Sequence, residues 1–217
     1  MAYKAVLFDM DGVLIESEWL IRETGIQALA EYGVKAQHED FLEFTGCGED
    51  RFIGGVAEKY GLTYTPAMKE RAYDFYGQRV AKDGNLPKDV LKTLQTLRDR
   101  GYLLVICSAA DLRKVNYNLS ALGADEGLFS AIVTGTDVTR KKPFPDIYLE
   151  GARRLGVAPE DCLVVEDAVS GVLAAHAAGM DCAAVPTTFT PERLRNEANP
   201  KYLLDELCRL TDLPDLQ

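Results

Sequence analysis

Short apolar runs alternate with amphipathic stretches along most of this chain, and this alternation limits the possible folds more than any other feature. Residues 3–8, 102–107, 131–135, 162–166 and 181–186 are strand-like apolar runs, and a stretch with helical spacing precedes each of the last four. Continuous apolar strands separated by helices indicate a parallel sheet that is covered on both faces. We therefore predict a doubly wound, Rossmann-like α/β core.

One long segment interrupts this alternation. From about Ser17 to Lys82 the pattern is helical only, and "KDGNLP" then breaks it. We predict an α/β core domain formed by residues 1–16 and 84–217, with a helical cap domain inserted at 17–83. Because ligands bind at the carboxyl ends of parallel strands, an insert that follows the first strand would lie over the site.

Two details of the insert predict local packing. The stretch "SEWLIRETGIQALAEYG" has an apolar stripe at helical spacing, formed by Trp19, Ile26, Leu29 and Ala30. Farther along, Gly54 and Gly55 lie inside a helical pattern, where glycine is unfavourable. These two glycines indicate either a break in the helix or a close packing contact.

The charge and the cysteines limit the partners and the compartment. A net charge of −10 argues against nucleic acid or an anionic membrane as a partner. No apolar stretch is long enough to span a bilayer, and the N-terminus lacks a secretory pattern. The five cysteines are odd in number and show no C-x-x-C spacing. We expect a cytoplasmic protein with reduced thiols, either a monomer or a weak dimer.

Polar residues follow the predicted strands where the strands end: Asp9, Asp11, Ser108, Glu166 and Asp167. Residues i and i+2 of an extended chain point the same way, so Asp9 and Asp11 can face one point. Two converging carboxylates repel each other unless a proton or a cation lies between them. An isolated D-x-D is more typical of a solvated turn, but acids at several strand ends favour an all-oxygen Mg²⁺ site over zinc.

A hydroxyl and a lysine belong to the same predicted edge. Ser108 in "VICSAAD" precedes a helix, and a hydroxyl beside the free amides of a helix N-terminus is typical of an anion site. Lys142 in "KKPFPD" precedes a proline, which favours a fixed geometry, and its ammonium can neutralise a phosphate. A helix N-cap for Ser108 is compatible with this role, and the alternative for Lys142 is a solvated basic cluster at residues 140–142.

In this order and spacing, the segments resemble the haloacid dehalogenase-like (HAD) superfamily of phosphotransferases. The matching segments are "FDMDGVL", "VICSAAD", "KKPFPD" and "VVEDAVSGVLAAHAAGM", and the resemblance covers nearly the whole chain. The helical insert is similar to the cap of the subclass that contains β-phosphoglucomutase and many small-molecule phosphatases.

The resemblance implies roles for the residues that bind and transfer phosphate. Asp9 is implied to be the nucleophile that forms an aspartyl-phosphate. Asp11 is implied to be the general acid for the leaving oxygen and then the general base for water. Ser108, Ala109 and Lys142 are implied to hold the phosphoryl oxygens, and the peptide bond after Lys142 is implied to be cis.

The resemblance also implies a Mg²⁺ site. Asp9, the backbone carbonyl of Asp11, and Asp167 are the implied ligands, with Glu166 acting through water. Asp11 argues for phosphate chemistry, because dehalogenases of the superfamily generally lack this second aspartate. We predict a Mg²⁺-dependent phosphatase of a small phosphorylated metabolite resembling a sugar phosphate. A non-catalytic sugar-phosphate sensor is the alternative from another class.

A phosphomutase resembling β-phosphoglucomutase is the main enzymatic alternative. This chain lacks the histidine that the mutase has after its first motif, since Ile21 stands there, and Asp111 replaces a lysine after the second motif. In the loop at residues 45–52, Glu49 stands where the mutase has a phosphate-binding arginine. Arg51, two residues on, could take that role or be a surface charge. Fewer cations for a second phosphate favour hydrolysis.

Overall fold

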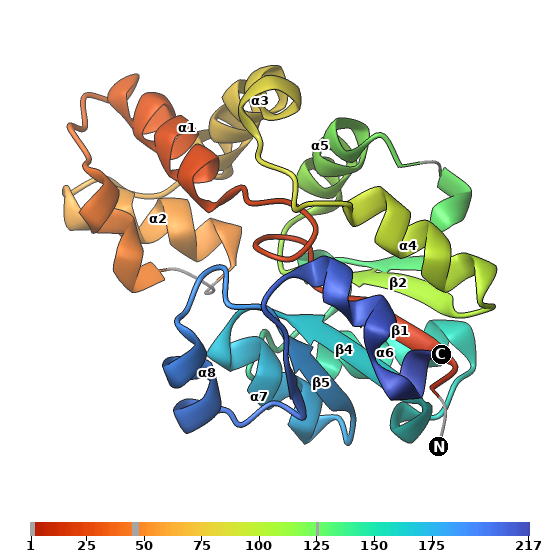
Figure 1. Cartoon of the computed structure of the whole chain (residues 1–217). Coiled ribbons are helices and arrows are strands. Elements are labelled where there is room, and N and C mark those ends of the chain that lie inside the picture. Colours follow the sequence, from red (N-terminus) through yellow and green to blue (C-terminus); the bar gives the residue numbers. More distant parts are fainter. Residues whose placement is uncertain (1–2, 45–47, 125) are drawn as a thin grey trace.

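The computed structural model describes residues 3–44, 48–124 and 126–217, and its centre is a parallel sheet. The strands are β1 (Ala5–Phe8), β2 (Leu103–Cys107), β3 (Ala131–Val133), β4 (Cys162–Glu166), β5 (Asp181–Ala184) and β6 (Tyr202–Leu203). Their order across the sheet is β3-β2-β1-β4-β5-β6, and every neighbouring pair is parallel (Figure 1). The predicted doubly wound core is confirmed, and β6 adds a strand that the apolar pattern did not indicate.

Helices cover both faces of the sheet, because successive strand residues point to opposite sides. Ala5 and Leu7 pack in the cluster that includes residues of α6 (Asp146–Leu155), α7 (Val169–Ala177) and α8 (Pro191–Glu197). Val6 and Phe8 pack in the other cluster, which includes residues of α4 (Val90–Asp99) and α5 (Leu112–Leu122). Short 3₁₀ helices lie at His38–Phe44, Glu126–Leu128, Gly135–Asp137, Pro159–Asp161, Leu207–Asp212 and Pro214–Leu216. The central strand is therefore apolar throughout because both of its faces are buried.

The register of the sheet brings the ends of the central strands level with one another. Phe8 of β1 lies opposite Ile106 of β2 and Val165 of β4. Strands β2 and β4 run one residue beyond these positions, so the segments that follow all three strands leave the sheet at the same edge. The backbone N–H of Asp9 still donates to the carbonyl of Val165 at 3.0 Å, which fixes the start of the loop after β1.

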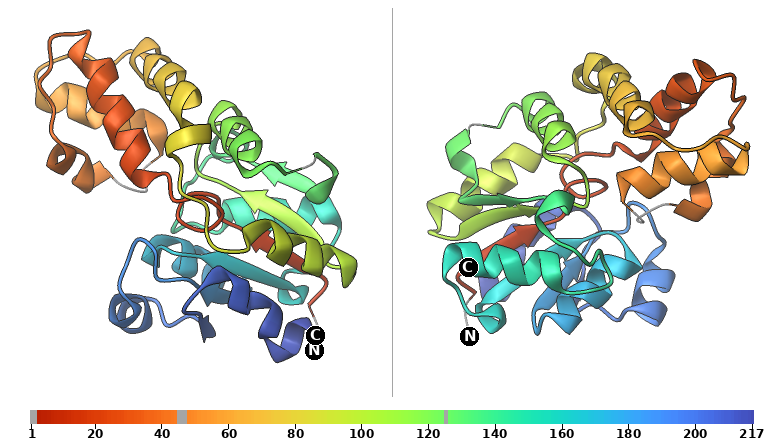
Figure 2. Two further views of the ribbon diagram at one scale, coloured as in Figure 1. Left: turned by 45° about the horizontal axis from the view of Figure 1, so that its top comes forward. Right: turned by 180° about the vertical axis from the view of Figure 1, so that it is seen from behind.

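The helical insert lies beyond the carboxyl ends of the strands, as Figures 1 and 2 show. Its helices are α1 (Glu18–Ala30), α2 (Glu49–Lys59) and α3 (Pro66–Asp83). The chain enters and leaves this group at neighbouring points, where Glu16 and Asn85 form an antiparallel bridge. The side-chain amide of Asn85 also donates to the Glu16 carboxylate at 2.7 Å. The division into separate domains at these two points stays a prediction.

The predicted apolar stripe of α1 is wrong at Trp19 and Ala30, whereas Leu29 and Ile26 pack against the core. Trp19 is 52% exposed and Ala30 is also exposed, whereas Leu29 is the one predicted residue that is fully buried. The residues that α1 buries are Leu20, Ile21, Thr24, Gly25, Ala28 and Leu29. A Cβ at Gly25 would lie 3.0 Å from the nearest side-chain atoms of Phe41 and Ile53. The neighbouring elements thus approach α1 most closely at a glycine, which the apolar spacing cannot reveal.

Helix α2 runs through Gly54 and Gly55 without a break. A Cβ at Gly55 would lie 2.4 Å from the ring of Phe44, and one at Gly54 would lie 2.9 Å from the ring of Tyr64. Of the two expectations for this glycine pair, the close packing contact is confirmed and the break is wrong. Both glycines allow an aromatic ring to lie directly on the helix backbone.

The four described cysteines, Cys107, Cys162, Cys182 and Cys208, are unpaired, and the first three are buried. This agrees with the expectation of reduced thiols, while Cys47 lies outside the described residues. Within the described ranges, none of the helices has the length and apolar character needed to cross a membrane.

Candidate active site

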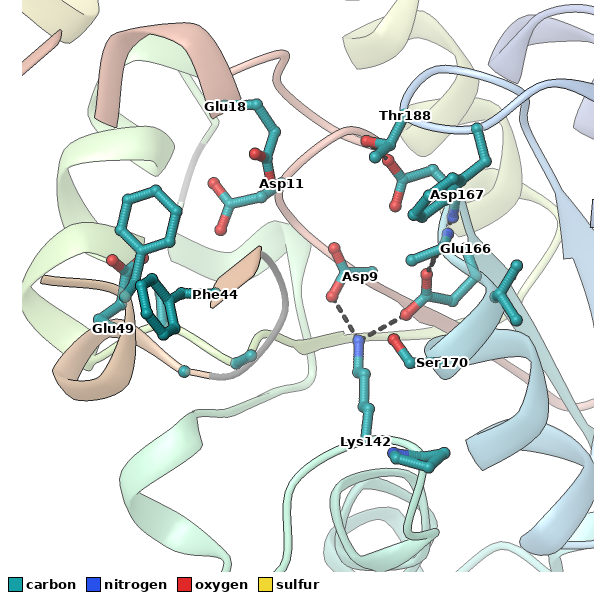
Figure 3. A pocket seen from close by; sticks show the side chains of 18 of the residues that line it. Asp9, Asp11, Glu18, Phe44, Glu49, Lys142, Glu166, Asp167, Ser170 and Thr188 are labelled. Carbon is teal, nitrogen blue, oxygen red and sulfur yellow. Dashed lines mark hydrogen bonds and ion pairs between the residues drawn. The ribbon is translucent and has the colours of Figure 1, made fainter. Parts of the chain in front are cut away.

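A cavity of about 360 Å³ lies between the carboxyl edge of the sheet and the helical insert (Figure 3). The core lines it with the predicted site residues Asp9, Asp11, Ala109, Lys142, Glu166 and Asp167. The insert lines it with Glu18, Ile21, Phe44, Gly48, Glu49 and Phe52. The fold therefore brings together acids and a lysine that come from three distant parts of the sequence.

Lys142 lies at the base of this cavity between two carboxylates. Its ammonium donates to Asp9 Oδ1 at 2.5 Å and to Glu166 Oε1 at 2.6 Å (Figure 3). The ring of Tyr148 lies 5.0 Å from the same nitrogen, a distance that permits a cation–π contact. The Lys142–Pro143 peptide bond is cis, as expected. Lys142 is thus a buried cation held by its neighbours, and the solvated basic cluster is wrong for this residue.

Burial and the neighbouring charges decide the ionisation of this group. Burial raises the pKa of Asp9 to about 7, against the opposing effect of Lys142, and the negative charges of Glu166 and Asp11 add to the rise. Burial opposes the charged form of Lys142, but Asp9 and Glu166 outweigh it and raise the pKa of the ammonium. Lys142 therefore stays charged, whereas Asp9 needs a further cation to be fully ionised near neutral pH.

All the acceptor positions of the Glu166 carboxylate are in use. Oε1 accepts from Lys142 and from the Tyr148 hydroxyl at 2.7 Å, and Oε2 accepts from the backbone N–H groups of Asp167 at 2.9 Å and Ala168 at 3.0 Å. Burial opposes its ionisation, but Lys142 and the hydrogen bonds hold the pKa of Glu166 below its usual value. A carboxylate has about four acceptor positions, so little capacity is left for a direct metal bond.

Asp167 forms the other side of the site and has no ion-pair partner among residues 3–44, 48–124 and 126–217. Its carboxylate accepts from the hydroxyl of Thr188. Burial, then the charges of Glu166 and Asp9, raise the pKa of Asp167. A Cβ at Gly12, whose φ is +83°, would lie 1.9 Å from Asp167 Oδ2. Only glycine leaves room here for this carboxylate.

These oxygens fit a hard divalent cation. Two buried carboxylates, Asp9 and Asp167, gather negative charge that Lys142 only partly offsets. In the parts of the chain that the structure describes, no group of three or more His, Cys, Asp and Glu side chains is arranged to hold a metal. The expected set of two carboxylates, a backbone carbonyl and water does not require such a group, and it suits Mg²⁺.

Asp11 points away from Lys142 and is held by two side chains of α5 and by Ser17, which precedes α1. Its Oδ1 accepts from Lys114 at 3.0 Å, from Asn118 at 3.4 Å and from the hydroxyl of Ser17. Lys114 also donates to Glu49 at 2.9 Å. These donors all contact Oδ1 of Asp11, so they orient the carboxyl, and Asp11 lines the cavity (Figure 3).

Ser108 follows β2 at the same edge of the sheet and is fully buried. Its hydroxyl accepts from the N–H of Ala110 at 3.1 Å, while its neighbour Ala109 lines the cavity. The N-cap position of α5 is Asp111, so the helix N-cap interpretation of Ser108 is wrong. Ala109 and Ala110 of this loop line the cavity, whereas Ser108 does not.

Arg51 does not line the cavity in this structure. Its guanidinium pairs with Glu58 at 2.5 Å, lies 4.9 Å from the centre of the Phe44 ring, and its side chain is 54% exposed. Residues 45–47 of the same loop lie outside the described residues. This placement matches the surface-charge alternative for Arg51.

Lys114 and Glu18 belong to the cavity but were not singled out by the sequence patterns. Lys114 lies on the buried face of α5 together with Val115, Asn118 and Leu122. A lysine at a core-facing position of an amphipathic helix was a usable signal, because lysine is almost never fully buried without a partner. Its partners come from other elements, so the pairing itself could not be inferred from local spacing.

Comparisons with known proteins agree with this geometry. The sequence matches the haloacid dehalogenase-like hydrolase family over residues 6–185. It is 41% identical over 211 residues to Protein SUPPRESSOR OF QUENCHING 1, chloroplastic, of Arabidopsis thaliana, a match that covers 95% of this chain and 20% of that protein. It is 30% identical to a phosphoglycolate phosphatase of Haemophilus influenzae, and that match covers 96% of each chain.

A solved structure has the same fold. CbbY from Rhodobacter sphaeroides, crystallised in complex with phosphate, superposes with a TM-score of 0.86 at 26% identity, and the match covers 96% of each chain. The chain spans about a fifth of the length of the Arabidopsis relative, so that likeness concerns one part of a longer protein.

Proposed function

Because the chain belongs to the haloacid dehalogenase-like hydrolases, we propose that it is a phosphatase that hydrolyses a small phosphorylated metabolite through an aspartyl-phosphate on Asp9. The observation that carries this proposal is the meeting of Asp9, Lys142 and Asp167 at one edge of the sheet, beside a cavity of substrate size. The likeness to a phosphoglycolate phosphatase and to a structure with bound phosphate supports it.

In the first step, a carboxylate oxygen of Asp9 attacks phosphorus while the bond from phosphorus to the ester oxygen breaks. Asp11 gives its proton to that leaving oxygen, so the alcohol leaves neutral. Ser17, Asn118 and Lys114 hold the other oxygen of Asp11 in place. Lys142 offsets negative charge on the phosphoryl oxygens and favours the ionised form of Asp9.

In the second step, water attacks the phosphorus of the aspartyl-phosphate and Asp11 accepts its proton. The bond from phosphorus to Asp9 breaks, which releases inorganic phosphate and restores the carboxylate. We assign Glu166 to holding Lys142, because its oxygens are already occupied by protein donors. The insert would exclude bulk water from the intermediate.

Asp9, the backbone carbonyl of Asp11, and Asp167 would hold Mg²⁺, with Glu166 acting at most through water. The bound ion would neutralise the charge of the transferring phosphoryl group. The raised pKa values of Asp9 and Asp167 are consistent with a site that is completed by a cation.

Hydrolysis is favoured over the mutase reaction by the charges in the cavity. Arg51 pairs with Glu58 at the surface, and Glu49 brings a carboxylate to the cavity instead of a cation. A mutase must retain a bisphosphate while it turns over, which requires cationic groups for the second phosphate. This arrangement offers few of them.

Phosphate release from a panel of phosphorylated metabolites tests the proposal. The wild type should release phosphate with Mg²⁺ and not with EDTA, and Asp9→Asn should abolish release because the nucleophile is gone. Asp205→Asn, the same change at an exposed aspartate, is the matched control and should remain active. β-Glucose 1-phosphate with a glucose 1,6-bisphosphate primer is included. Isomerisation faster than release would favour the mutase, and inactivity on every compound would favour the sensor.

A further inference from the structure

Glu49 and Lys114 form an ion pair inside the cavity, beyond the groups that handle phosphate. Glu49 begins α2 of the insert, and Lys114 lies on α5 of the core. Their charged atoms are 2.9 Å apart, and only 2% of the Lys114 side chain and 11% of the Glu49 side chain are exposed. Both residues line the cavity, so a bound substrate would contact them.

This pair has unused hydrogen-bonding capacity at the wall of the cavity, which both residues line. Glu49 Oε2 is buried and has no hydrogen-bond partner among the described residues. A Lys ammonium has three N–H donors. Lys114 uses two of them, one for Asp11 Oδ1 and one for Glu49 Oε1. A buried carboxylate oxygen without a donor is unfavourable, so the site is best satisfied when a ligand supplies one. A hydroxyl can donate to Glu49 and accept from Lys114 at once.

The charge of this part of the cavity opposes a second anionic group. Three carboxylates, those of Asp11, Glu18 and Glu49, surround the one ammonium of Lys114. Arg193 also lines the cavity, but it is half exposed and pairs with Glu197 at 2.9 Å. A second phosphate or a carboxylate would meet like charges here, whereas a hydroxyl would not.

The remaining wall suits the carbon skeleton of a hydroxylated ligand. Phe44 and Phe52 of the insert line the same cavity and present apolar surface beside the polar pair. Pockets for small molecules are mostly apolar, with a few polar groups that fix the orientation of the ligand. We propose that Glu49 and Lys114 bind the hydroxyl groups of the leaving alcohol, so that the substrates are neutral polyol or sugar monophosphates. This inference rests on the proposed function.

Two esters that differ only in their hydroxyl groups test the inference. Sorbitol 6-phosphate and hexyl phosphate share a six-carbon chain and one phosphate. The wild type should prefer sorbitol 6-phosphate in kcat/KM by about tenfold or more, as expected for hydrogen bonds to charged groups. Glu49→Ala should lower this preference about tenfold towards unity. Glu49→Gln keeps the volume of the side chain, and the same preference is measured in this variant in case Glu49→Ala does not fold.

Asp50→Asn is the matched control. Asp50 is the next residue of α2, but its side chain is 63% exposed and pairs with Lys69, outside the cavity. This variant should keep the preference for sorbitol 6-phosphate. If the Glu49 variants acted by weakening the contact between insert and core, Asp50→Asn should lose the preference as well. A loss that is confined to the Glu49 variants indicates a contact between Glu49 and the substrate.

Three results would overturn the inference. The preference could survive in both Glu49 variants, or fructose 1,6-bisphosphate or phosphoglycolate could be hydrolysed faster than sorbitol 6-phosphate. A preference for 6-aminohexyl phosphate would instead assign Glu49 to a cationic group. If no ester is hydrolysed, p-nitrophenyl phosphate included, the proposed function fails separately. Calorimetric affinities of the two esters for Asp9→Asn then decide, with equal affinities overturning the hydroxyl site.

Discussion

At the scale of single residues, the site depends on one buried ammonium that is shared by two carboxylates. Lys142 is 7% exposed at its side chain, Asp9 11% and Glu166 1%. Taking charges out of water is costly, so each member of such a group is stable only while its partners are present. Removing the lysine leaves two carboxylates facing each other in a nearly dry environment.

We therefore expect Lys142→Met to destabilise the protein by about 3–5 kcal/mol, the usual effect of removing one partner of a buried ion pair. Urea unfolding followed by circular dichroism would measure this change, with phosphate release assayed in parallel. Activity should be lost in the same variant. Mg²⁺ is omitted from the unfolding experiment, so that a bound cation does not replace the missing charge.

The double variant Lys142→Met/Glu166→Gln is the control. It removes one of the two unpaired carboxylates, so its unfolding free energy should recover part of the loss seen in Lys142→Met. Glu166→Gln could instead lower the free energy of unfolding by the same amount in the wild type and in Lys142→Met. Such additive effects would mean that the two residues are not coupled.

The strand-end residues could be predicted from the sequence because they follow directly from local pattern. Asp9, Lys142 and Asp167 each lie next to a strand or a proline, and a parallel sheet brings its carboxyl ends together whatever the strand order. The Glu49–Lys114 pair could not be predicted, because it depends on how the insert packs against α5.

At the scale of elements, glycines decide where the insert packs most closely. The apolar stripe predicted the buried face of α1 only in part, because Thr24 and Gly25 lie on that face and Trp19 does not. Hydrophobic spacing assumes that contact surfaces are made of large side chains. Here a helix approaches its neighbours through a missing side chain, and only the tertiary structure shows which face that is.

The glycine pair of α2 gives an element-level prediction. Gly55→Ala would place a Cβ 2.4 Å from the ring of Phe44, which lines the cavity, and the ring must move. Such overpacking usually costs about 1–3 kcal/mol, offset in part by the better helix propensity of alanine. We expect a lower melting temperature together with a raised KM, because the cavity wall is displaced.

Gly54→Ala is the matched control from the same turn of the helix. Its Cβ would lie 2.9 Å from the ring of Tyr64, which does not line the cavity. Calorimetry should show a loss of stability, but steady-state kinetics should show an unchanged KM. If both variants raise KM equally, the effect is a general one on α2, and the role of Phe44 as a cavity wall is contradicted.

At the scale of the whole molecule, the parallel sheet and the helical insert could be read from the alternation of patterns, but the strand order could not. The strands are apolar apart from Glu166 and Asp181 at strand ends, so nothing in Val105 or Val164 indicates which neighbour it pairs with. The short strand β6 at Tyr202–Leu203 was missed because two residues show no period. The order follows from right-handed crossovers and from burial of both faces, which are properties of the assembled core.

The folded molecule should lose stability with rising pH when no metal is present. Asp9 has a pKa of about 7 when folded, against about 3.8 for an ordinary aspartate. Between these values the unfolded chain releases this proton and the folded chain keeps it, so stability falls as pH rises through this window. The pKa of Glu166 is lowered in the folded chain, so Glu166 affects the pH dependence of stability only in more acidic solution. There its contribution to the free energy of unfolding is lost as pH falls.

Melting temperatures measured from about pH 4 to about pH 7 with EDTA, and again with excess Mg²⁺, test this expectation. With EDTA the wild type should lose more stability across the window than Asp9→Asn, which lacks the titrating group. Mg²⁺ should remove most of this difference, because a cation beside Asp9 and Asp167 favours their charged forms. Each 1 kcal/mol corresponds to about 2–4 °C in a chain of this size. Identical pH profiles for the wild type and Asp9→Asn in EDTA would show that burial of Asp9 does not control the stability of the metal-free fold.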